Sequence, residues 1–207
     1  MDFRSSEAVL SGPRPEDVLP DTAATAVKVL VVGGFGVGKT TLVGAVSEIR
    51  PLKTEETMTQ AGIGVDDIAG IEGKTQTTVA LDFGRISINS ELILYLFGTP
   101  GQERFWFLWR GLFEGALGAV VLVDTARLEV SFDAMGLLEE QGVPFVVAVN
   151  AFPRSPVHEA ADLRTALDLP EHVPIHFFDA RRREDCRDVL IALMRYLHSL
   201  AATPEAS

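Results

Sequence analysis

The residues best suited to chemistry lie in one glycine-rich stretch near the start of the chain. An apolar run over residues 27–32 leads into Gly33-Gly34-Phe35-Gly36-Val37-Gly38-Lys39-Thr40, which fits the pattern G-x-x-x-x-G-K-T. Glycines let backbone N–H groups curl around phosphate oxygens, and a helix that follows points the positive end of its dipole at the same anion. The sequence therefore predicts a phosphate-binding loop between a strand and a helix.

The side chains of this loop have separate expected roles. Lys39 should reach the β- and γ-phosphates of a nucleotide, and Thr40 should ligate Mg²⁺. A glycine-rich turn without a ligand would need neither lysine nor threonine at these two positions. The predicted nucleotide contacts in this region are Gly33, Gly34, Gly36, Val37, Gly38, Lys39, Thr40 and Thr41.

The composition favours one soluble, cytoplasmic domain. A chain of 207 residues with 47% hydrophobic residues can bury one good core. The net charge of −11 argues against nucleic-acid binding, which depends mostly on lysine and arginine. No window approaches the roughly 20 apolar residues of a membrane span, and no signal peptide or lipidation motif is present. Cys186 is the single cysteine, so no internal disulfide is expected.

The pattern of short apolar runs and helical segments predicts an α/β protein with a central, mostly parallel, six-stranded sheet flanked by helices. The apolar spacing over residues 184–200 predicts a helix packed on the core. We expect a flexible N-terminal arm at residues 1–25, one domain at residues 26–200 and a disordered tail at residues 201–207. The predicted strands lie near residues 27–32, 77–83, 91–97, 118–124, 144–150 and 174–178.

Two later segments resemble the switch regions of the Ras-like small GTPases. Thr78 opens a strand as in switch I of Rab-type GTPases, and the resemblance makes it a second Mg²⁺ ligand. The run Gly98-Thr99-Pro100-Gly101-Gln102 resembles the D-T-A-G-Q segment of switch II. By that resemblance Gly101 donates its N–H to the γ-phosphate and Gln102 orients the attacking water. Gly98 stands where the family aspartate supports Mg²⁺, so the affinity and the geometry of the metal site stay open.

The motifs that recognise guanine in this family are kept only in part. Asn150 matches the first residue of N-K-x-D, but Pro153 replaces the aspartate that accepts two hydrogen bonds from guanine. Ala180 occupies the place of the family alanine whose N–H contacts the guanine O6 atom. Asn150 and Ala180 are therefore predicted nucleotide contacts, while the preference for guanine stays open.

Together these segments cover residues 27–200 in the family's order and imply a three-layer P-loop NTPase (Ras-like) fold. The wording of residues 99–102 is most similar to the actinobacterial conservon G proteins and the bacterial gliding-motility GTPases. That resemblance implies a signalling switch that binds Mg²⁺ with GTP or GDP and hydrolyses GTP slowly, with Lys39 and Gln102 as catalytic residues. It also implies a roadblock-type regulatory protein and a histidine-kinase-like sensor as partners, which leaves peripheral recruitment to a membrane open.

Two other functions are kept beside this one. Gly98 and Pro153 motivate a nucleotide-locked interaction module that hardly hydrolyses its ligand. A P-loop kinase or ATPase would need an acceptor site and usually an arginine-rich lid, which the sequence does not offer.

Several residues outside the motifs have two open interpretations. Arg85 and Arg104 could each be a catalytic arginine or an exposed surface charge. The tryptophans Trp106 and Trp109 could pack inward or form a partner surface after switch II. The long stretch at residues 50–76 is expected to hold the switch I region, with room for an extra strand.

Overall fold

The computed structural model describes residues 25–50, 52–58, 77–101 and 109–202, and these carry the fold. The predicted N-terminal arm lies outside the described residues, apart from Thr25, which begins the first strand. Of the predicted tail, Ala201 and Ala202 complete the last helix, and the rest is likewise outside.

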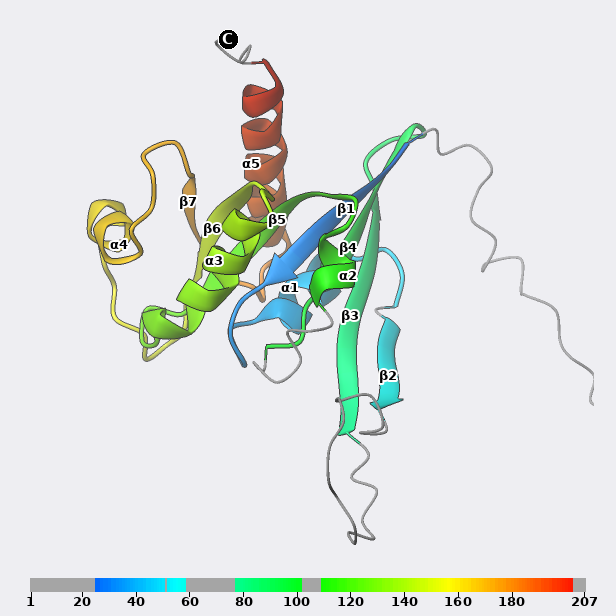
Figure 1. The fold of residues 1–207 in the computed structure, drawn as a ribbon, viewed down its shortest axis with the longest axis horizontal. Helices are drawn as coiled ribbons and strands as arrows, with labels where there is room; N and C mark the ends of the chain where they lie inside the picture. Colours follow the sequence, from blue (N-terminus) through cyan, green and yellow to red (C-terminus); the bar gives the residue numbers. More distant parts are fainter. Residues whose placement is uncertain (1–24, 51, 59–76, 102–108, 203–207) are drawn as a thin grey trace, which may run out of the picture.

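The centre of the molecule is one seven-stranded sheet with the strand order β2-β3-β4-β1-β5-β6-β7 (Figure 1). β2 and β3 pair in antiparallel fashion, as do β3 and β4, while the remaining neighbours are parallel. The strands are β1 (Thr25–Val32), β2 (Leu52–Met58), β3 (Thr77–Ser87), β4 (Leu92–Gly98), β5 (Ala116–Val123), β6 (Phe145–Asn150) and β7 (Ile175–Phe178).

Helices cover both faces of this sheet and complete three layers (Figure 1). One face packs against α1 (Lys39–Val46) and α5 (Arg183–Ala202). The other packs against α2 (Trp109–Phe113), α3 (Phe132–Glu140) and α4 (Ala160–Ala166), with a short 3₁₀ helix at Leu128–Ser131 before α3. The layers explain why the central strands are apolar throughout, because alternate side chains of one strand enter opposite cores.

Strand β1 illustrates this division. Val29 and Val31 lie in the core under α1 and α5, whereas Leu30 and Val32 lie in the core on the opposite face. All four side chains are fully buried. The strand therefore holds the phosphate-binding loop that follows it in a fixed position relative to both layers.

The predicted fold class is confirmed, and the six predicted strands are present, with ends that lie within four residues of the predicted ones. The sheet has one strand more, β2, which falls in the stretch at residues 50–76 where we left room for it. The predicted C-terminal helix is α5, and its apolar stripe packs on the core. Cys186 is a buried residue of this helix.

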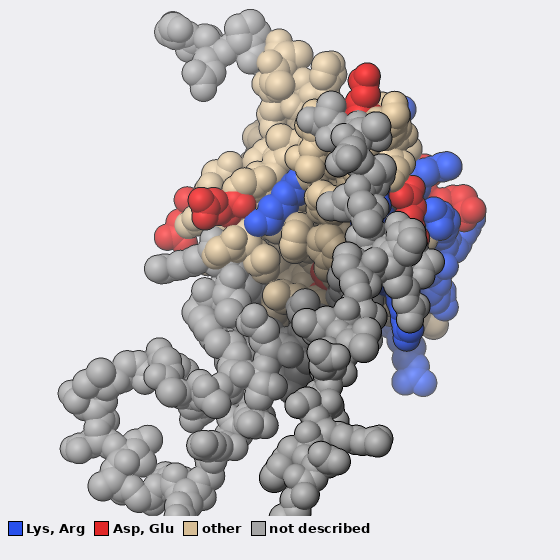
Figure 2. Space-filling model, turned by 90° about the vertical axis from the view of Figure 1, so that its right-hand side faces the viewer, with Lys and Arg blue, Asp and Glu red and all other residues tan. Residues whose placement is uncertain are grey.

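Charged side chains are unevenly distributed over the described surface. On the face shown in Figure 2, basic side chains gather along one edge with acidic side chains beside them. A smaller acidic group lies at the opposite edge, and most of the other described surface is uncharged. None of the helices described here is both long and apolar enough to cross a lipid bilayer.

Candidate nucleotide-binding site

The phosphate loop, residues 33–40, connects β1 to α1 in a conformation that glycine makes available. Gly33, Gly36 and Gly38 have φ angles of 138°, 77° and 106°, which side-chain-bearing residues rarely adopt. A Cβ atom on Gly33 would also lie 2.5 Å from the carbonyl oxygen of Leu122. The glycines of the motif therefore serve both the curvature of the loop and its close approach to β5.

Lys39 lies at the start of α1 and turns back over the loop. Its Nζ donates hydrogen bonds to the carbonyl oxygens of Gly33, at 2.8 Å, and Gly34, at 2.6 Å. The residue is only 7% exposed. Burial lowers the pKa of Lys39 to about 8, and the nearby negative charge of Asp82 offsets only part of this effect. An incoming phosphate would supply the negative charge that a buried ammonium group requires.

A carboxylate stands beside the position where the family aspartate is missing. Asp82 of β3 is in register with Gly98 of β4, so the two residues are direct neighbours across the antiparallel pair. The Thr40 hydroxyl donates a 2.5 Å hydrogen bond to Oδ2 of Asp82, which is buried. A Cβ atom on Gly98 would lie 2.9 Å from Cβ of Asp82. The glycine thus leaves the space that the Asp82 side chain occupies.

A cavity of about 380 Å³ opens at this end of the sheet. Gly101 forms one wall, where an added Cβ would lie 2.7 Å from Nζ of Lys39 and 2.8 Å from the backbone of Gly34. Six predicted site residues line the cavity: Gly36, Gly38, Lys39, Thr40, Thr41 and Gly101. Four further lining residues were not predicted: Phe35, Asp82, Thr99 and Pro100.

The oxygen atoms of Thr40 and Asp82 suit a magnesium ion. A hydroxyl and a carboxylate are hard donors of the kind that Mg²⁺ prefers, and both side chains line the same cavity. Over the described residues, no group of three or more histidine, cysteine, aspartate or glutamate side chains could hold a metal. Two protein ligands fit Mg²⁺ that is bound mainly through phosphate oxygens and water.

Asn150 ties the far side of the phosphate loop to the loop after β7. Its Nδ2 donates to the carbonyl oxygen of Val37 and its Oδ1 accepts from the N–H of Ala180, both at 3.0 Å. Asn150 and Ala180 are buried against Gly38, where an added Cβ would lie 2.6 Å from Nδ2 of Asn150 and 3.4 Å from Cβ of Ala180. Both predicted residues therefore lie next to the loop. The Asn150 amide bonds to Val37 and to the Ala180 N–H.

A second polar network holds the tip of the loop. Asp124, at the end of β5, accepts hydrogen bonds from Arg127, at 3.3 Å and 3.2 Å, and from the Ser155 hydroxyl, at 2.6 Å. Arg127 in turn donates to the carbonyl oxygen of Phe35 at 3.3 Å. Although burial alone would raise it, the hydrogen bonds from Ser155, Ala126 and Arg127 hold the pKa of Asp124 below its usual value. The network joins the phosphate loop to the loops after β5 and β6.

The remaining predicted residues are distributed as follows. Gln102, Arg104 and Trp106 lie outside the described residues, and only the backbone of Trp109 is described, at the start of α2. The backbone of Thr78 pairs with Thr57 of β2.

Arg85 is placed away from the cavity. It pairs with Tyr95 within the sheet, and its N–H bonds to Ser47 just after α1. A role as catalytic arginine is therefore not supported for Arg85, because that role requires contact with the phosphates.

Asp82 and Arg127 are the main residues that sequence reasoning missed. Asp82 carried a usable signal, since it is a single carboxylate in a segment of apolar residues that precedes the strand lacking its aspartate. Its position beside Gly98 follows only from the antiparallel register of β3 with β4, which the sequence does not give. Arg127 gave no signal, because nothing in the sequence distinguishes it from other loop arginines.

The chain is similar to several curated proteins over part of its length. It is 32% identical to the uncharacterized protein MJ1339 of Methanocaldococcus jannaschii over 126 residues, which is 60% of this chain and 69% of that protein. It is 32% identical to the probable translation initiation factor IF-2 of Thermofilum pendens over 132 residues, but spans only 22% of it. It is 37% identical over 62 residues to the Ras-related protein Rab-11C of Dictyostelium discoideum, which is 28% of this chain and 27% of that one.

Among solved structures, the fold is similar to the G domain of the FeoB iron transporter of T. maritima. The match covers 86% of this chain and 99% of that one, with a TM-score of 0.55 and 18% identity. It establishes that the architecture is a GTPase-like P-loop fold. The sequence also matches, over residues 31–199, the family described as conserved hypothetical ATP binding protein. Since these residues are well over half of the chain, the protein belongs to that family.

Proposed function

We propose that this protein is a Mg²⁺-dependent nucleotide switch that binds GTP or GDP and hydrolyses GTP slowly. The observation that carries the proposal is the convergence of Lys39, Thr40 and Asp82 on one cavity at the start of α1. These residues supply a cation for the phosphates and two oxygens for a metal ion, next to a helix N-terminus that favours anions. Residues 26–200 would then act as one nucleotide-binding unit.

The metal site is proposed to differ from the pattern of Ras-like proteins in one ligand. Asp82 would take the part of the aspartate that Gly98 replaces, because its carboxylate reaches the Thr40 hydroxyl from the neighbouring strand. Mg²⁺, when bound, would neutralise charge that develops on the phosphates. Thr78 stays a proposed second threonine ligand on the strength of the resemblance to switch I.

Hydrolysis is proposed to depend on the segment that follows β4. Gly101 lies against Lys39 and Gly34, so its N–H is close to the loop that would hold the γ-phosphate. Gln102 is the next residue, and by resemblance to switch II it would orient the attacking water while Lys39 stabilises the transferring phosphoryl group. Slow turnover is expected because no arginine of the described residues lines the cavity.

A second candidate function is a nucleotide-locked interaction module. Gly98 and Pro153 depart from the family pattern at the metal and base positions, which favours a protein that binds nucleotide without efficient turnover. By resemblance to the conservon and gliding-motility groups, the proposed partners of either form are a roadblock-type protein and a histidine-kinase-like sensor. We place this activity in the cytoplasm, with recruitment to a membrane surface through such partners.

One set of measurements tests the proposal. Nucleotide-free protein is titrated with labelled GTP and GDP, with Mg²⁺ and with EDTA, and phosphate release is followed in a single turnover. We expect Mg²⁺-dependent binding and slow release that is lost in Gln102→Leu. Binding with no release in the unsubstituted protein would favour the locked module, and absence of binding would refute both functions.

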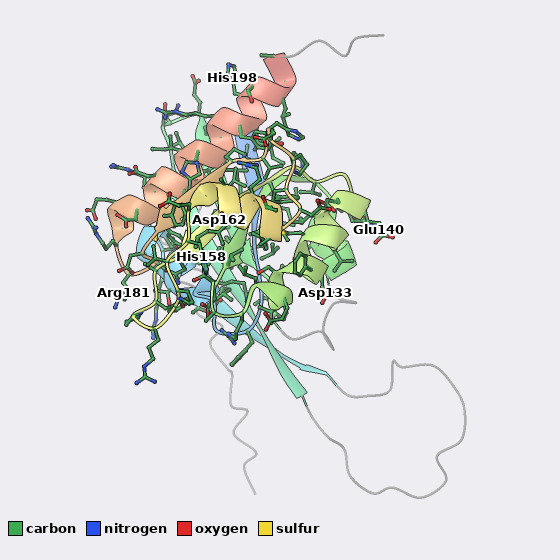
Figure 3. All side chains as sticks on the ribbon, turned by 90° about the vertical axis from the view of Figure 1, so that its left-hand side faces the viewer. Asp133, Glu140, His158, Asp162, Arg181 and His198 are labelled. Atoms are coloured by element: carbon green, nitrogen blue, oxygen red, sulfur yellow. The ribbon has the colours of Figure 1, made fainter. Side chains whose placement is uncertain are left out.

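The variant Asp82→Asn tests the metal site separately. We expect it to lower affinity in Mg²⁺ by about 10- to 100-fold, the usual cost of disturbing a metal's protein partners, and to leave affinity in EDTA unchanged. Asp133→Asn is the matched control, because Asp133 is an exposed carboxylate on α3, shown in Figure 3. Equal losses with and without Mg²⁺ would rule out a metal role for Asp82.

A further inference from the structure

An apolar groove lies at the end of the sheet opposite the phosphate loop, between α5 and the hairpin that joins β3 to β4. It has a volume of about 350 Å³. Its apolar walls are made by Ile88, Leu92 and Leu94 on the side of the sheet and by Leu190, Ile191 and Met194 on the side of the helix. Ile88 and Ile191 are 52% and 39% exposed, so part of this apolar surface faces solvent.

Two basic side chains border these apolar walls. Arg195 and His198 of α5 also line the groove, and both are exposed. Among the described residues, neither side chain forms an ion pair or a hydrogen bond. Figure 3 shows His198 on the last part of α5. The groove therefore suits a short apolar segment that also carries carboxylates.

The chain enters the sheet beside this groove. Thr25, the first residue of β1, is in register with Leu92, and its N–H donates to the carbonyl oxygen of Glu91 at 2.9 Å. Figure 1 shows the start of β1 next to the hairpin of β3 and β4. Because side chains alternate along a strand, Thr25 lies on the same sheet face as Val29 and Val31, which is the face that α5 covers. The residues that precede Thr25 therefore begin at the edge of the groove.

One stretch before Thr25 has the composition that the groove requires. Residues 16–21, which lie outside the described residues, have the sequence EDVLPD, with two adjacent aliphatic side chains between carboxylates. Leu19 is six residues before Thr25. Six residues of extended chain span up to about 20 Å, so the linker is long enough for Val18 and Leu19 to reach the walls.

We propose that residues 16–21 of this chain bind in the groove beside α5 of the same molecule. In this arrangement Val18 and Leu19 cover the apolar walls. The carboxylates of Glu16 and Asp17 lie near Arg195 and His198, which lack other partners among the described residues. A segment this short binds weakly as a free peptide, but a short linker gives it an effective concentration on the order of millimolar. The contact does not depend on nucleotide binding.

The test uses the full chain and a protease that cleaves after glutamate. Glu16 belongs to the docked segment, so docking should slow cleavage there in proportion to the time that the segment spends docked. Ile191→Asp places a carboxylate on the apolar wall and leaves the sequence around Glu16 unchanged. We expect cleavage after Glu16 to be about tenfold faster in this variant, since burial of one aliphatic side chain corresponds to about tenfold in an equilibrium.

Val157→Asp is the matched control, because Val157 is an aliphatic residue outside the groove that is 95% exposed. Cleavage after Glu16 should proceed in this variant as fast as in the unsubstituted protein. Equal rates in the unsubstituted protein and in Ile191→Asp would overturn the proposal. A rate that rises when the unsubstituted protein is diluted would also overturn it, because the groove would then hold the segment of a second copy.

A cross-link tests the same contact without adding a charge to the groove. Leu19→Cys combined with Ile191→Cys should form a disulfide within one chain, because a disulfide requires the two Cα atoms to approach within about 7 Å. Cys186 does not compete, because its burial raises the pKa of its thiol to about 12. The control pair Leu19→Cys with Val157→Cys should oxidise about tenfold more slowly. Comparable rates for the two pairs would overturn the proposal, whatever effect Ile191→Asp has on the stability of α5.

Discussion

The two ends of the candidate site differ in what their polar groups are free to do. At the phosphate end, Lys39, Thr40 and Asp82 line an open cavity. The bonds of Lys39 to the backbone of the loop and the bond between Thr40 and Asp82 can be exchanged for bonds to a ligand. At the opposite end, both polar side-chain atoms of Asn150 and both carboxylate oxygens of Asp179 are bonded to neighbouring residues. One end is arranged to bind charge and the other to hold loops together.

This difference teaches which parts of a motif can change. In the proposed metal site, the role of the metal-supporting carboxylate would pass to a neighbouring strand, because Asp82 and Gly98 lie side by side and either backbone could carry the side chain. No such substitute is seen for Pro153, because the carboxylate of Asp179 is bonded to Arg181 and that of Asp124 to Arg127 and Ser155. Phosphate binding is therefore expected to be strong, and base selection weak.

The largest expected effect comes from removing the cation of the phosphate end. Lys39→Ala should weaken triphosphate binding by about 100- to 1000-fold, because a buried charge that pairs with phosphate is lost. Equilibrium titration with GTPγS measures this loss. Lys28→Ala, which removes a lysine of β1 that bonds to Glu114 far from the cavity, should change the affinity little. Comparable losses in both variants would mean that the effect is one of folding.

The next largest effect is expected when the carboxylate is moved from position 82 on β3 to position 98 on β4. Asp82→Gly should lose about 10- to 100-fold of the Mg²⁺-dependent affinity, and adding Gly98→Asp should restore most of it. The expected reason is that Asp82→Gly clears the space into which a side chain at position 98 must fit, 2.9 Å from the present Cβ of Asp82. Titrations in Mg²⁺ and in EDTA measure the metal-dependent part.

The single variant Gly98→Asp is the control for this exchange. It should destabilise the protein in thermal unfolding, because the new Cβ would crowd the side chain of Asp82. If the double variant binds Mg²⁺ and nucleotide no better than Asp82→Gly, the two positions are not equivalent. That result would contradict the proposal that the carboxylate of the metal site can be carried by either strand.

A pH series separates the two ends without any substitution. The pKa of Lys39 in the free protein is lowered to about 8 by burial, and bound phosphates would favour its charged form. Triphosphate affinity should be constant below pH 8 and fall by about tenfold per pH unit above it, since binding then requires uptake of a proton. The Asp179–Arg181 pair does not titrate in this range, because hydrogen bonds from Arg181 lower the pKa of Asp179 to about 2.

The ratio of ATP to GTP affinity should therefore stay constant from pH 6 to 9. A ratio that changes above pH 8 would contradict the assignment of the pH dependence to Lys39.

The fold was largely predictable because its signals are local and periodic. The apolar runs of β1, β5 and β6 reflect burial of both faces of each strand, and the stripe of α5 reflects burial of one helix face. The sequence does not predict β2 directly, because Leu52–Met58 has the sequence LKTEETM, which carries little apolar periodicity. Pairing with β3, which no local pattern reports, makes it a strand.

The phosphate end of the site was predictable for a different reason. The motif from Gly33 to Thr40 fixes its own geometry, because glycine conformations and a helix start follow from neighbouring residues in the chain. Asp82 is 42 residues from Thr40 and becomes its partner only through the register of β3 with β4. The hydrogen bonds of Asn150 and Arg127 likewise join loops that are far apart in the sequence, so no spacing in the sequence predicts them.

The smallest predicted effect concerns the network that joins the two ends. Arg127→Ala should raise the dissociation rate of bound nucleotide by about two- to fivefold, because a partly exposed ion pair that steadies the carbonyl of Phe35 is lost. Ser155→Ala removes a bond to the same carboxylate, Asp124, from the base-side loop. If the network couples the loops, the double variant should dissociate nucleotide little faster than Arg127→Ala alone, whereas independent sites would give the product of the two effects. Stopped-flow release of a fluorescent nucleotide measures all four rates, with Arg195→Ala on the far part of α5 as the control. If the effects of the two substitutions on the dissociation rate multiply, the loops that Arg127 and Ser155 contact are held independently of each other.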